Sequence, residues 1–346
     1  MVKSELIFFS ILVCLLLFSF TAFPQKTDRV LLDNNDWITG EIKKLDYAKL
    51  SLKTDAAGTI QIKWDRIYQV KSDKYFEIGL GEGIKYFGSL DISESDDKYK
   101  VLVVTEEGET EVDMNQIVEI TPIKNRFWAR IDGNLSMGFS YTKGSDVRQW
   151  NGSFNLYYRH SKSLTSIMSS SIFTEQPERD PTSKQDFGLS YQRFMKKNFG
   201  YTNFTSFQQN SELGIALRSS VGIGFNKNWL KSNLQRFLTT IGLIVNREKG
   251  IEGSESQTNW EGIVRLEYRI FRYKDPEIDI TSYFEFYPSF TVKDRYRTDL
   301  NINFKYELFK DFFLGLTFYH NLDTKPPESA ISTSDWGITN SIGYTF

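Results

Sequence analysis

Apolar and polar residues alternate in long runs over the last two-thirds of the chain. From Phe127 onward twelve runs can be counted, each about 11 to 18 residues long. In the sixth, Leu217, Val221 and Phe225 fall on one face, and Gly222 and Asn226 on the other. Alternation at every second position predicts β-strands. Because this run is longer than the usual strand of a soluble protein, it favours strands that cross a membrane at a tilt.

The segments between the runs differ in length on the two sides of the predicted sheet. If Phe127 starts on the periplasmic side, the turns of that side are short except for a longer one at 227–233. Short turns are expected at 161–162, 196–198, 272–277 and 310–311, and polar loops on the opposite side at 176–184, 248–257, 288–295 and 323–334. This asymmetry is typical of outer-membrane barrels. The predicted fold class of residues 126–346 is therefore an all-β, antiparallel transmembrane β-barrel of about 12 strands.

The end of the chain agrees with this fold. Trp336, Ile338 and Ile342 alternate with small or polar residues, and the last strand ends in Tyr344 and Phe346. An aromatic residue at the end of the last strand resembles the signal that barrel-insertion machinery recognises. We interpret Tyr344 and Phe346 as an assembly signal, and we expect outer-membrane lipid and the insertion machinery as partners.

Residues 26–125 contain two similar halves. Segments 38–42, 50–52, 58–62 and 67–70 are echoed about 48 to 50 residues later by 87–90, 101–103, 108–112 and 117–120. Each half gives only three or four short strands, so the halves are expected to pack together as a duplicated small β-domain in the periplasm. Its role is open between a structural spacer and a module that binds a periplasmic partner.

The first residues indicate the compartment. Residues 1–25 combine Lys3, an apolar run from Leu6 to Phe20 and a small-residue exit, which predicts a secretory signal peptide. The run is shorter than the roughly 20 residues of a spanning helix. Removal of this peptide also removes Cys14, the single cysteine, so no disulfide and no thiol chemistry is expected.

Charge divides the remaining chain into two regions. Residues 26–125 hold 14 Lys and Arg against 20 Asp and Glu, a net charge of −6, whereas residues 126–346 hold 27 against 23, a net charge of +4. An acidic exported domain is a poor match for nucleic acid, so no nucleic-acid partner is expected. The basic excess of the second region is too small to indicate a specific anionic partner.

Charged residues on the polar face of the predicted strands are expected to line the barrel lumen. They are Arg218, Arg265, Glu267, Arg269, Asp279, Glu285, Lys305 and Glu307. The short turn at 272–277 pairs two neighbouring strands, which places Arg269 near Asp279 and Arg265 near Glu285. Such pairs either neutralise one another in a plugged barrel or create a field that selects ions in a watery constriction.

Catalysis and metal binding are not expected. His160 and His320 are the only histidines, and they are predicted near opposite ends of the barrel. Roughly 25 Å of apolar band separates those levels, so the two side chains cannot form one site. With no cysteine in the exported chain and these histidines far apart, we expect no catalytic residue, no cofactor and no metal.

The barrel region resembles a known family. The resemblance rests on residues 128–141, 191–194, 216–225, 326–328 and 334–337 together with the terminal strand. Residues 127–346 look like the salt-induced outer membrane proteins grouped as domain of unknown function 481, and the duplicated domain lies outside the resemblance. It implies location in the outer membrane of a Gram-negative cell and a link to osmotic or salt adaptation, with no known activity.

Three functions are consistent with these observations. The first is a non-enzymatic barrel that forms a narrow channel for small solutes or ions. The second is an envelope-maintenance or adaptor barrel whose periplasmic domain binds a partner. The third is an outer-membrane hydrolase, which the positions of the two histidines disfavour.

Overall fold

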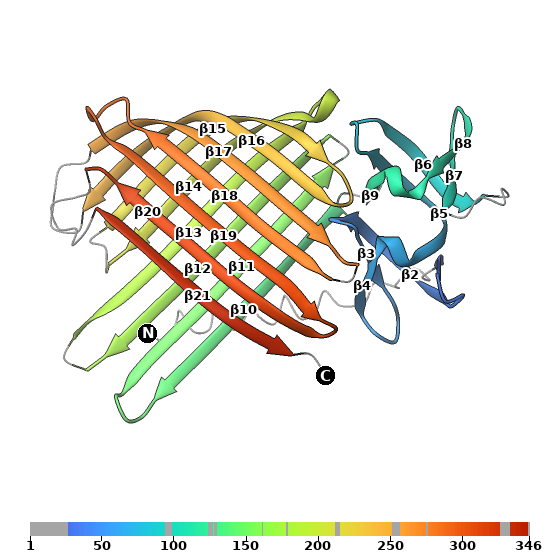
Figure 1. The fold of residues 1–346 in the computed structure, drawn as a ribbon. Coiled ribbons are helices and arrows are strands. Elements are labelled where there is room, and N and C mark those ends of the chain that lie inside the picture. Colours follow the sequence, from blue (N-terminus) through green and yellow to red (C-terminus); the bar gives the residue numbers. More distant parts are fainter. Residues whose placement is uncertain are drawn as a thin grey trace.

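The computed structural model describes residues 27–93, 99–123, 127, 130–160, 162–177, 179–211, 215–250, 257–274, 276–325 and 333–344. The expected signal peptide at 1–25 and the expected assembly residue Phe346 lie outside this part of the chain. Two β-structures follow one another in sequence, a small one and a large one (Figure 1). Within the described residues, no helix has the length and apolar character needed to span a bilayer.

The small N-terminal domain is a nine-stranded sheet with the order β4-β3-β2-β1-β5-β6-β7-β8, in which β9 pairs with both β2 and β5. Two short 3-10 turns, η1 (Trp64–Arg66) and η2 (Met114–Gln116), interrupt it. The strands are β1 (Asp28–Leu32), β2 (Trp37–Asp46), β3 (Lys49–Lys53), β4 (Thr59–Lys63), β5 (Ile67–Leu80), β6 (Lys85–Ile92), β7 (Lys100–Thr105), β8 (Gly108–Asp113) and β9 (Ile117–Pro122).

The duplication predicted from the sequence is visible as a repeated order of elements. In each half a strand leads into a hairpin, a 3-10 turn and a further strand, as β2 to β5 and again as β6 to β9. The two turns meet, because the Trp64 indole donates to the carbonyl oxygen of Met114 at 2.7 Å. Both residues lie in one shared core with Ile42, Leu52 and Ile120, so neither half packs alone.

A buried carboxylate fixes the centre of this domain. Asp28 has no exposed surface, and its oxygens accept from the backbone N–H of Ile42 and the hydroxyl of Ser72, both at 2.7 Å. The ammonium of Lys74 lies 3.2 Å from the same carboxylate. A buried charge is tolerated only when it is paired and hydrogen-bonded, and Asp28 meets both conditions.

The large unit is a twelve-stranded antiparallel sheet in which each strand pairs with the next along the chain. The predicted fold class is thereby confirmed. The strands are β10 (Ile131–Thr142), β11 (Val147–His160), β12 (Ser163–Gln176), β13 (Arg179–Phe194), β14 (Phe199–Asn210), β15 (Ile215–Lys231), β16 (Gln235–Gly250), β17 (Gln257–Arg272), β18 (Ile278–Pro288), β19 (Tyr296–Phe309), β20 (Phe312–Asp323) and β21 (Ser334–Tyr344).

The outer surface of this sheet is apolar, as the alternation predicts. Val221 and Phe225 on β15 and Ile241 on β16 each keep more than half of their surface exposed, whereas Gly222 and Asn226, which directly follow Val221 and Phe225, are buried. Side chains of one strand alternate between its two faces, so the exposed apolar set points outward and the polar set inward. An apolar exterior around a polar interior is the reverse of a soluble barrel and matches a barrel surrounded by lipid.

Two predicted connections are wrong. The loop expected at 176–184 is largely strand, because β12 extends to Gln176 and β13 starts at Arg179. The longer turn expected at 227–233 is also mostly strand, since β15 continues to Lys231 through a register shift between Asn228 and Leu230. A bulge adds one residue and reverses the alternation beyond it, which hides the end of such a strand from a period-two pattern.

The sheet curls into a barrel with one seam. Among the described residues, β10 pairs only with β11 and β21 only with β20, so no hydrogen-bond ladder joins β10 to β21. Met137 on β10 is 68% exposed and Ile342 on β21 is 70% exposed, more than any other large apolar residue described. Both strands therefore lack a neighbour on one side.

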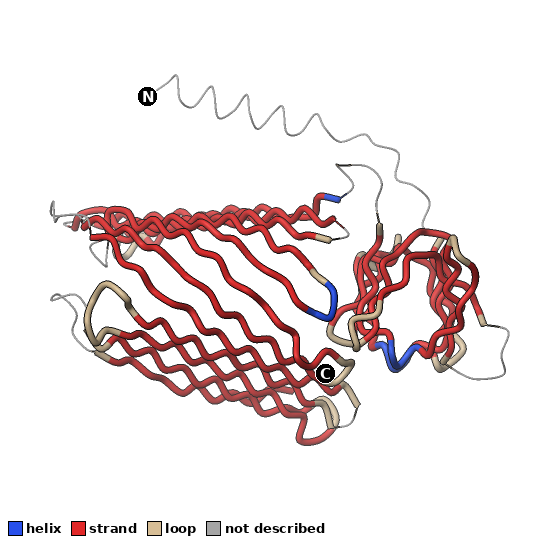
Figure 2. Tube along the Cα trace, turned by 90° about the horizontal axis from the view of Figure 1, so that it is seen from above, coloured by secondary structure: helices blue, strands red, loops and turns tan. Residues whose placement is uncertain are grey.

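The N-terminal domain lies against one end of the barrel, as both views show (Figures 1 and 2). Hydrogen bonds from Asn198 in the 3-10 turn η4 (Lys196–Asn198) and from Asn233 in the β15–β16 turn reach its backbone. We call this the short-turn end, because the β11–β12, β13–β14, β15–β16, β17–β18 and β19–β20 connections lie there.

Candidate functional site

The inward face of β17, β18 and β19 carries a concentration of charge. Glu261 on β17 is 3% exposed and Glu285 on β18 is 8% exposed, although neither lies in the apolar core of the N-terminal domain. Their outward neighbours Trp260 and Phe284 are exposed. The carboxylates therefore point into the barrel. We call the inward charged residues of these three strands the charged wall.

The two ion pairs expected across the β17–β18 turn are present. Arg265 and Glu285 are direct partners in the antiparallel register, and their side chains meet at 2.6 Å. Asp279 is opposite Phe271, so Arg269 reaches it diagonally, at 3.1 Å. Glu267 joins the first pair through the Nε of Arg265, also at 2.6 Å. Five of the predicted lumen residues thus form two groups on two strands, the triad of Arg265, Glu267 and Glu285 and the pair of Arg269 and Asp279.

The sequence analysis missed a further ion pair on the same wall. Arg297 on β19 contacts Glu261 at 2.7 Å, and the side-chain amide of Asn246 donates to the same carboxylate at 2.9 Å. Glu285 also accepts from the hydroxyl of Tyr287 at 2.7 Å. Glu261 lies four residues before Arg265 and so on the same face of β17, which is the signal that could have identified it.

The other predicted lumen residues make local contacts. Arg218 on β15 donates to the side chain of Gln208 at 3.0 Å, and the ammonium of Lys305 lies 3.9 Å from the centre of the Phe313 ring. The carboxylate of Glu307 accepts from the backbone N–H groups of Asp311 and Glu277, at 2.9 and 3.1 Å. Glu307 therefore connects the β17–β18 turn with the β19–β20 turn at the barrel end.

Small polar side chains face inward from β10, β11 and β12, on the opposite side of the interior. On β10 and β11, Ser136 and Ser153 share a hydrogen bond of 2.8 Å, and Asn155 donates to Asn134 at 3.3 Å. Ser166 on β12 is buried on the same inward face. We call these inward serine and asparagine residues of β10 to β12 the polar wall. Charged and small polar side chains thus face each other across the barrel.

At the short-turn end, a tight turn of the N-terminal domain contacts residues of the barrel interior. Tyr47 follows β2 in a left-handed conformation, with φ of 49°. The centre of its ring lies 4.1 Å from the guanidinium of Arg236 and 4.4 Å from that of Arg269, and the ring meets the Phe271 ring edge-on at 5.4 Å. Phe271 is fully buried within the core of the N-terminal domain. The end of β17 and the domain are therefore one packed unit.

Glu119 of β9 connects strands from different sides of the barrel end. Its carboxylate lies 2.5 Å from the ammonium of Lys231 on β15 and 3.5 Å from the guanidinium of Arg159 on β11. Burial by itself raises the pKa of this carboxyl group, but the charges of Lys231, Arg159 and Arg236 outweigh it and lower the pKa from 4.5 to about 2. Glu119 is thus held as an anion.

Further charge pairs surround this contact. Asp46 meets Arg236 at 2.6 Å, and Lys63 pairs with Glu277 of the β17–β18 turn. The side chain of Asn233 donates to the carbonyl oxygen of Ile117 at 2.8 Å. The acidic N-terminal domain and the basic barrel, which the sequence showed as two regions of opposite sign, are therefore partners of each other. The opposite net charges of the two regions were the signal in the sequence that could have indicated this interface.

The remaining predicted residues lie apart from both sites. His160 ends β11 at the short-turn end, whereas His320 lies near the far end of β20, opposite Trp336 on the outward face. Tyr344 is the last described residue of β21, opposite Phe312 and 60% exposed. Across the described ranges, no group of three or more His, Cys, Asp or Glu side chains is placed to hold a metal ion.

Comparison with known proteins identifies the family. The family model described as "Protein of unknown function, DUF481" matches residues 135–346, which covers all but the start of the barrel and none of the N-terminal domain. A search among curated proteins found no match. This family and the all-β barrel are compatible with an outer-membrane β-barrel protein. Because the match covers more than half of the chain, the protein belongs to the DUF481 family.

Proposed function

We propose that this protein is a non-catalytic outer-membrane β-barrel that gives small ions or solutes a narrow, charge-lined passage. We propose further that its N-terminal domain covers the periplasmic end of that passage. The observation that carries the proposal is the barrel interior, in which the charged wall faces the polar wall across the lumen.

The composition of the interior supports a hydrated passage. A barrel of twelve strands is wider than the packed eight-strand case and narrower than the open sixteen-strand porins. The polar wall is built of small side chains such as Ser136, Ser153 and Ser166. Small hydroxyl-bearing side chains leave space and offer hydrogen bonds to water. The ion pairs opposite them provide the field that selects ions in a constriction.

The N-terminal domain supports control of this passage. Tyr47 packs on Arg236 and Arg269, both on inward positions of neighbouring strands, and Glu119 connects β11 with β15. The domain is thus attached to several parts of the barrel end. In this proposal, conduction requires the domain to shift from that end. Passage of small ions is also the basis on which we propose a link to osmotic or salt adaptation.

The second candidate is a closed barrel that anchors the N-terminal domain for a role in envelope maintenance. The specific observation in its favour is that Arg265, Glu285, Arg269 and Asp279 are already paired with one another. Paired charges are what a plugged interior needs, because an unpaired buried charge is strongly destabilising. In this case the partner of the N-terminal domain is the barrel itself together with a further envelope component.

Single-channel recording in planar bilayers separates the two candidates. The wild-type chain is compared with Glu119→Gln and with the double variant Asp279→Asn/Glu285→Asn. We expect Glu119→Gln to raise the open probability, because Lys231 and Arg159 lose their shared anion. The double variant removes the carboxylate partner of Arg269 and one of the two carboxylate partners of Arg265, so the preference should shift toward anions.

A matched control is Asp311→Asn, which neutralises an exposed carboxylate in the β19–β20 turn outside both walls. Its conductance and selectivity should equal those of the wild type. Silence of the wild type and of Glu119→Gln, combined with a loss of stability in the double variant, would establish the closed barrel. Conductance with unchanged selectivity in the double variant would show that the charged wall does not line the path.

A further inference from the structure

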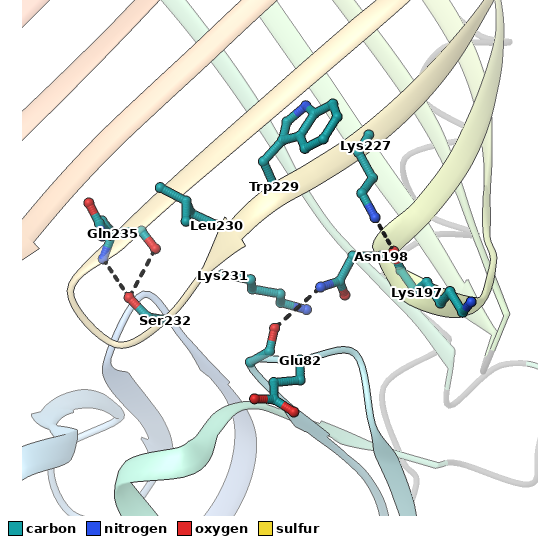
Figure 3. Close-up of a pocket in the computed structure, with 10 residues that line it drawn as sticks. Glu82, Lys197, Asn198, Lys227, Trp229, Leu230, Lys231, Ser232 and Gln235 are labelled. Atoms are coloured by element: carbon teal, nitrogen blue, oxygen red, sulfur yellow. Dashed lines mark hydrogen bonds between the residues drawn. The ribbon is translucent and has the colours of Figure 1, made fainter.

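A cavity of about 450 Å³ lies outside the lumen, where the N-terminal domain meets the barrel. Its walls come from Gly81 and Glu82 after β5, from η4, and from the end of β15 with the turn that follows. Figure 3 shows Lys227 and Asn198 directed toward this junction and Trp229 directed away from the domain along the barrel strand. We call this cavity the rim pocket.

The rim pocket is cationic. Three lysines line it, Lys197, Lys227 and Lys231, against the single acidic residue Glu82. Lys231 is neutralised by Glu119. No carboxylate in the part of the chain that the structure describes lies within ion-pair distance of Lys197 or Lys227. Two positive charges are therefore left for an anion from outside the protein.

The turn that carries these charges is fixed in place. Lys197 and Asn198 both adopt left-handed backbone conformations, with φ of 55° and 60°. The ammonium of Lys227 donates to the carbonyl oxygen of Lys197 at 2.6 Å and lies 4.0 Å from the centre of the Phe199 ring. The side chain of Asn198 donates to the carbonyl oxygen of Gly81 at 3.3 Å, which joins the turn to the N-terminal domain. The ammonium of Lys227 and the backbone of the turn that carries Lys197 are thus held before any ligand arrives.

An apolar surface continues from the cationic pocket. Trp229 is 61% exposed, Phe199 47% and Leu230 43%. The indole of Trp229 donates to the hydroxyl of Thr239 at 3.1 Å, which fixes the ring on the outer side of β15 and β16. Tryptophan beside lysine at the end of a membrane strand is the arrangement found at the level of lipid head groups. A free anion has no apolar part that could contact this surface, whereas the acyl chains of a lipid would cover it.

We infer that the rim pocket binds the head group of an anionic phospholipid of the inner leaflet of the outer membrane. Its phosphate interacts with Lys197 and Lys227, and its acyl chains lie on Trp229 and Leu230. This inference rests on the membrane placement in the proposed function and is independent of whether the barrel conducts. The site includes the N-terminal domain through Gly81 and Glu82, so the bound lipid contacts both parts of the protein.

Fluorescence quenching by brominated lipids tests the site. The full chain is placed in phosphatidylcholine vesicles that contain either phosphatidylglycerol or phosphatidylcholine with brominated acyl chains. The Trp229 signal is taken as the difference between the wild type and Trp229→Phe. We expect brominated phosphatidylglycerol to quench this signal more strongly. The double variant Lys197→Gln/Lys227→Gln should weaken the preference at least about tenfold, since each lysine near an anionic surface contributes about 1 kcal/mol.

Two controls make the result specific. Lys310→Gln removes an exposed lysine from the β19–β20 turn, at the same end but outside the rim pocket, and should leave the preference unchanged. Inorganic phosphate added to the vesicles should not displace the lipid. Equal quenching by both lipids, an unchanged preference in the lysine double variant, or an equal loss in Lys310→Gln would overturn the inference. Displacement by phosphate would assign the site to a free anion instead.

Migration of unheated and boiled samples on detergent gels is measured on the same vesicles. A barrel that inserts, migrates faster unheated and shows no lipid preference refutes the rim-pocket inference alone. A chain that fails to insert refutes the membrane placement, and the inference with it.

Discussion

The carboxylate of Glu119 in the N-terminal domain lies 2.5 Å from the ammonium of Lys231 at the end of β15. This contact joins two parts of the chain that are 112 residues apart. Only 23% of the Glu119 side chain and 15% of the Lys231 side chain are exposed, so solvent screens the pair weakly. The pair therefore responds to pH more than to moderate salt.

Acid should release the N-terminal domain. The pKa of Glu119 is lowered from 4.5 to about 2 in the folded protein. A lowered carboxyl pKa adds stability that is fully present above pH 4.5 and is lost as the pH falls toward 2. A shift of this size corresponds to a free-energy contribution of about 3 kcal/mol. Limited proteolysis at pH 7, 4 and 2.5 should show increasing cleavage of the domain. Glu119→Gln should remove most of this pH dependence, whereas Glu109→Gln, an exposed site on β8, should retain it.

Tyr47→Ala should loosen the domain without unfolding the barrel. The ring contacts Arg236, Arg269 and Phe271, and its removal takes away two cation–π contacts and part of a core contact. We expect a loss of about 2 to 3 kcal/mol in the docking of the domain. Hydrogen exchange of β2 and β3 would report it. Tyr75→Ala, at a position 40% exposed, is the matched control, and an equal effect there would contradict the role of Tyr47.

Two inward glycines should respond differently to the same substitution. A Cβ at Gly242 would lie 2.1 Å from the carbonyl oxygen of Ile223 and 2.7 Å from the Cα of Gly224, whereas a Cβ at Gly188 meets nothing within 4 Å. Gly242→Ala should therefore force β15 and β16 apart and lower the yield of folded barrel. Gly188→Ala should be silent. The heat-dependent shift on detergent gels measures both, and equal yields would contradict the close approach.

Tyr344→Asp should lower barrel assembly and leave export intact. Tyr344 lies on the outward face of β21, opposite Phe312, and 60% of it is exposed. A charge at this position would face lipid and would replace part of the expected assembly signal. The amount of processed protein and the fraction that shifts on detergent gels separate export from assembly. Thr339→Asp, on the inward face of the same strand, provides a comparison, and an equal loss there would argue against a specific signal.

The fold could be predicted because the alternation of apolar and polar residues along a strand can be recognised in a single sequence. Leu217, Val221 and Phe225 show the outward face of β15 directly, and the short turn after β17 correctly placed Arg265 beside Glu285. The prediction failed where the alternation itself is interrupted. The register shift between Asn228 and Leu230 concealed the end of β15, and with it Trp229 and the rim pocket.

The interface between the two parts could not be predicted from local patterns. Tyr47 is one tyrosine in a short turn, and its importance arises from Arg236 and Phe271, about 190 and 220 residues later in the chain. Glu119 is likewise one of many acidic residues in its region. Neither periodicity nor composition shows which acid meets which base, because that choice depends on the position of the barrel end relative to the domain.

The interface at the short-turn end also sets an order of events during biogenesis. Glu119 contacts Arg159 on β11 and Lys231 on β15, and Tyr47 contacts β16 and β17. These four strands are brought together only when the sheet has curled, so the docking surface does not exist until β11 to β17 are in place. The N-terminal domain also buries Phe271 of β17 in its own core, so its packing is completed by the barrel. Engagement of the N-terminal domain therefore depends on prior assembly of the barrel from β11 to β17.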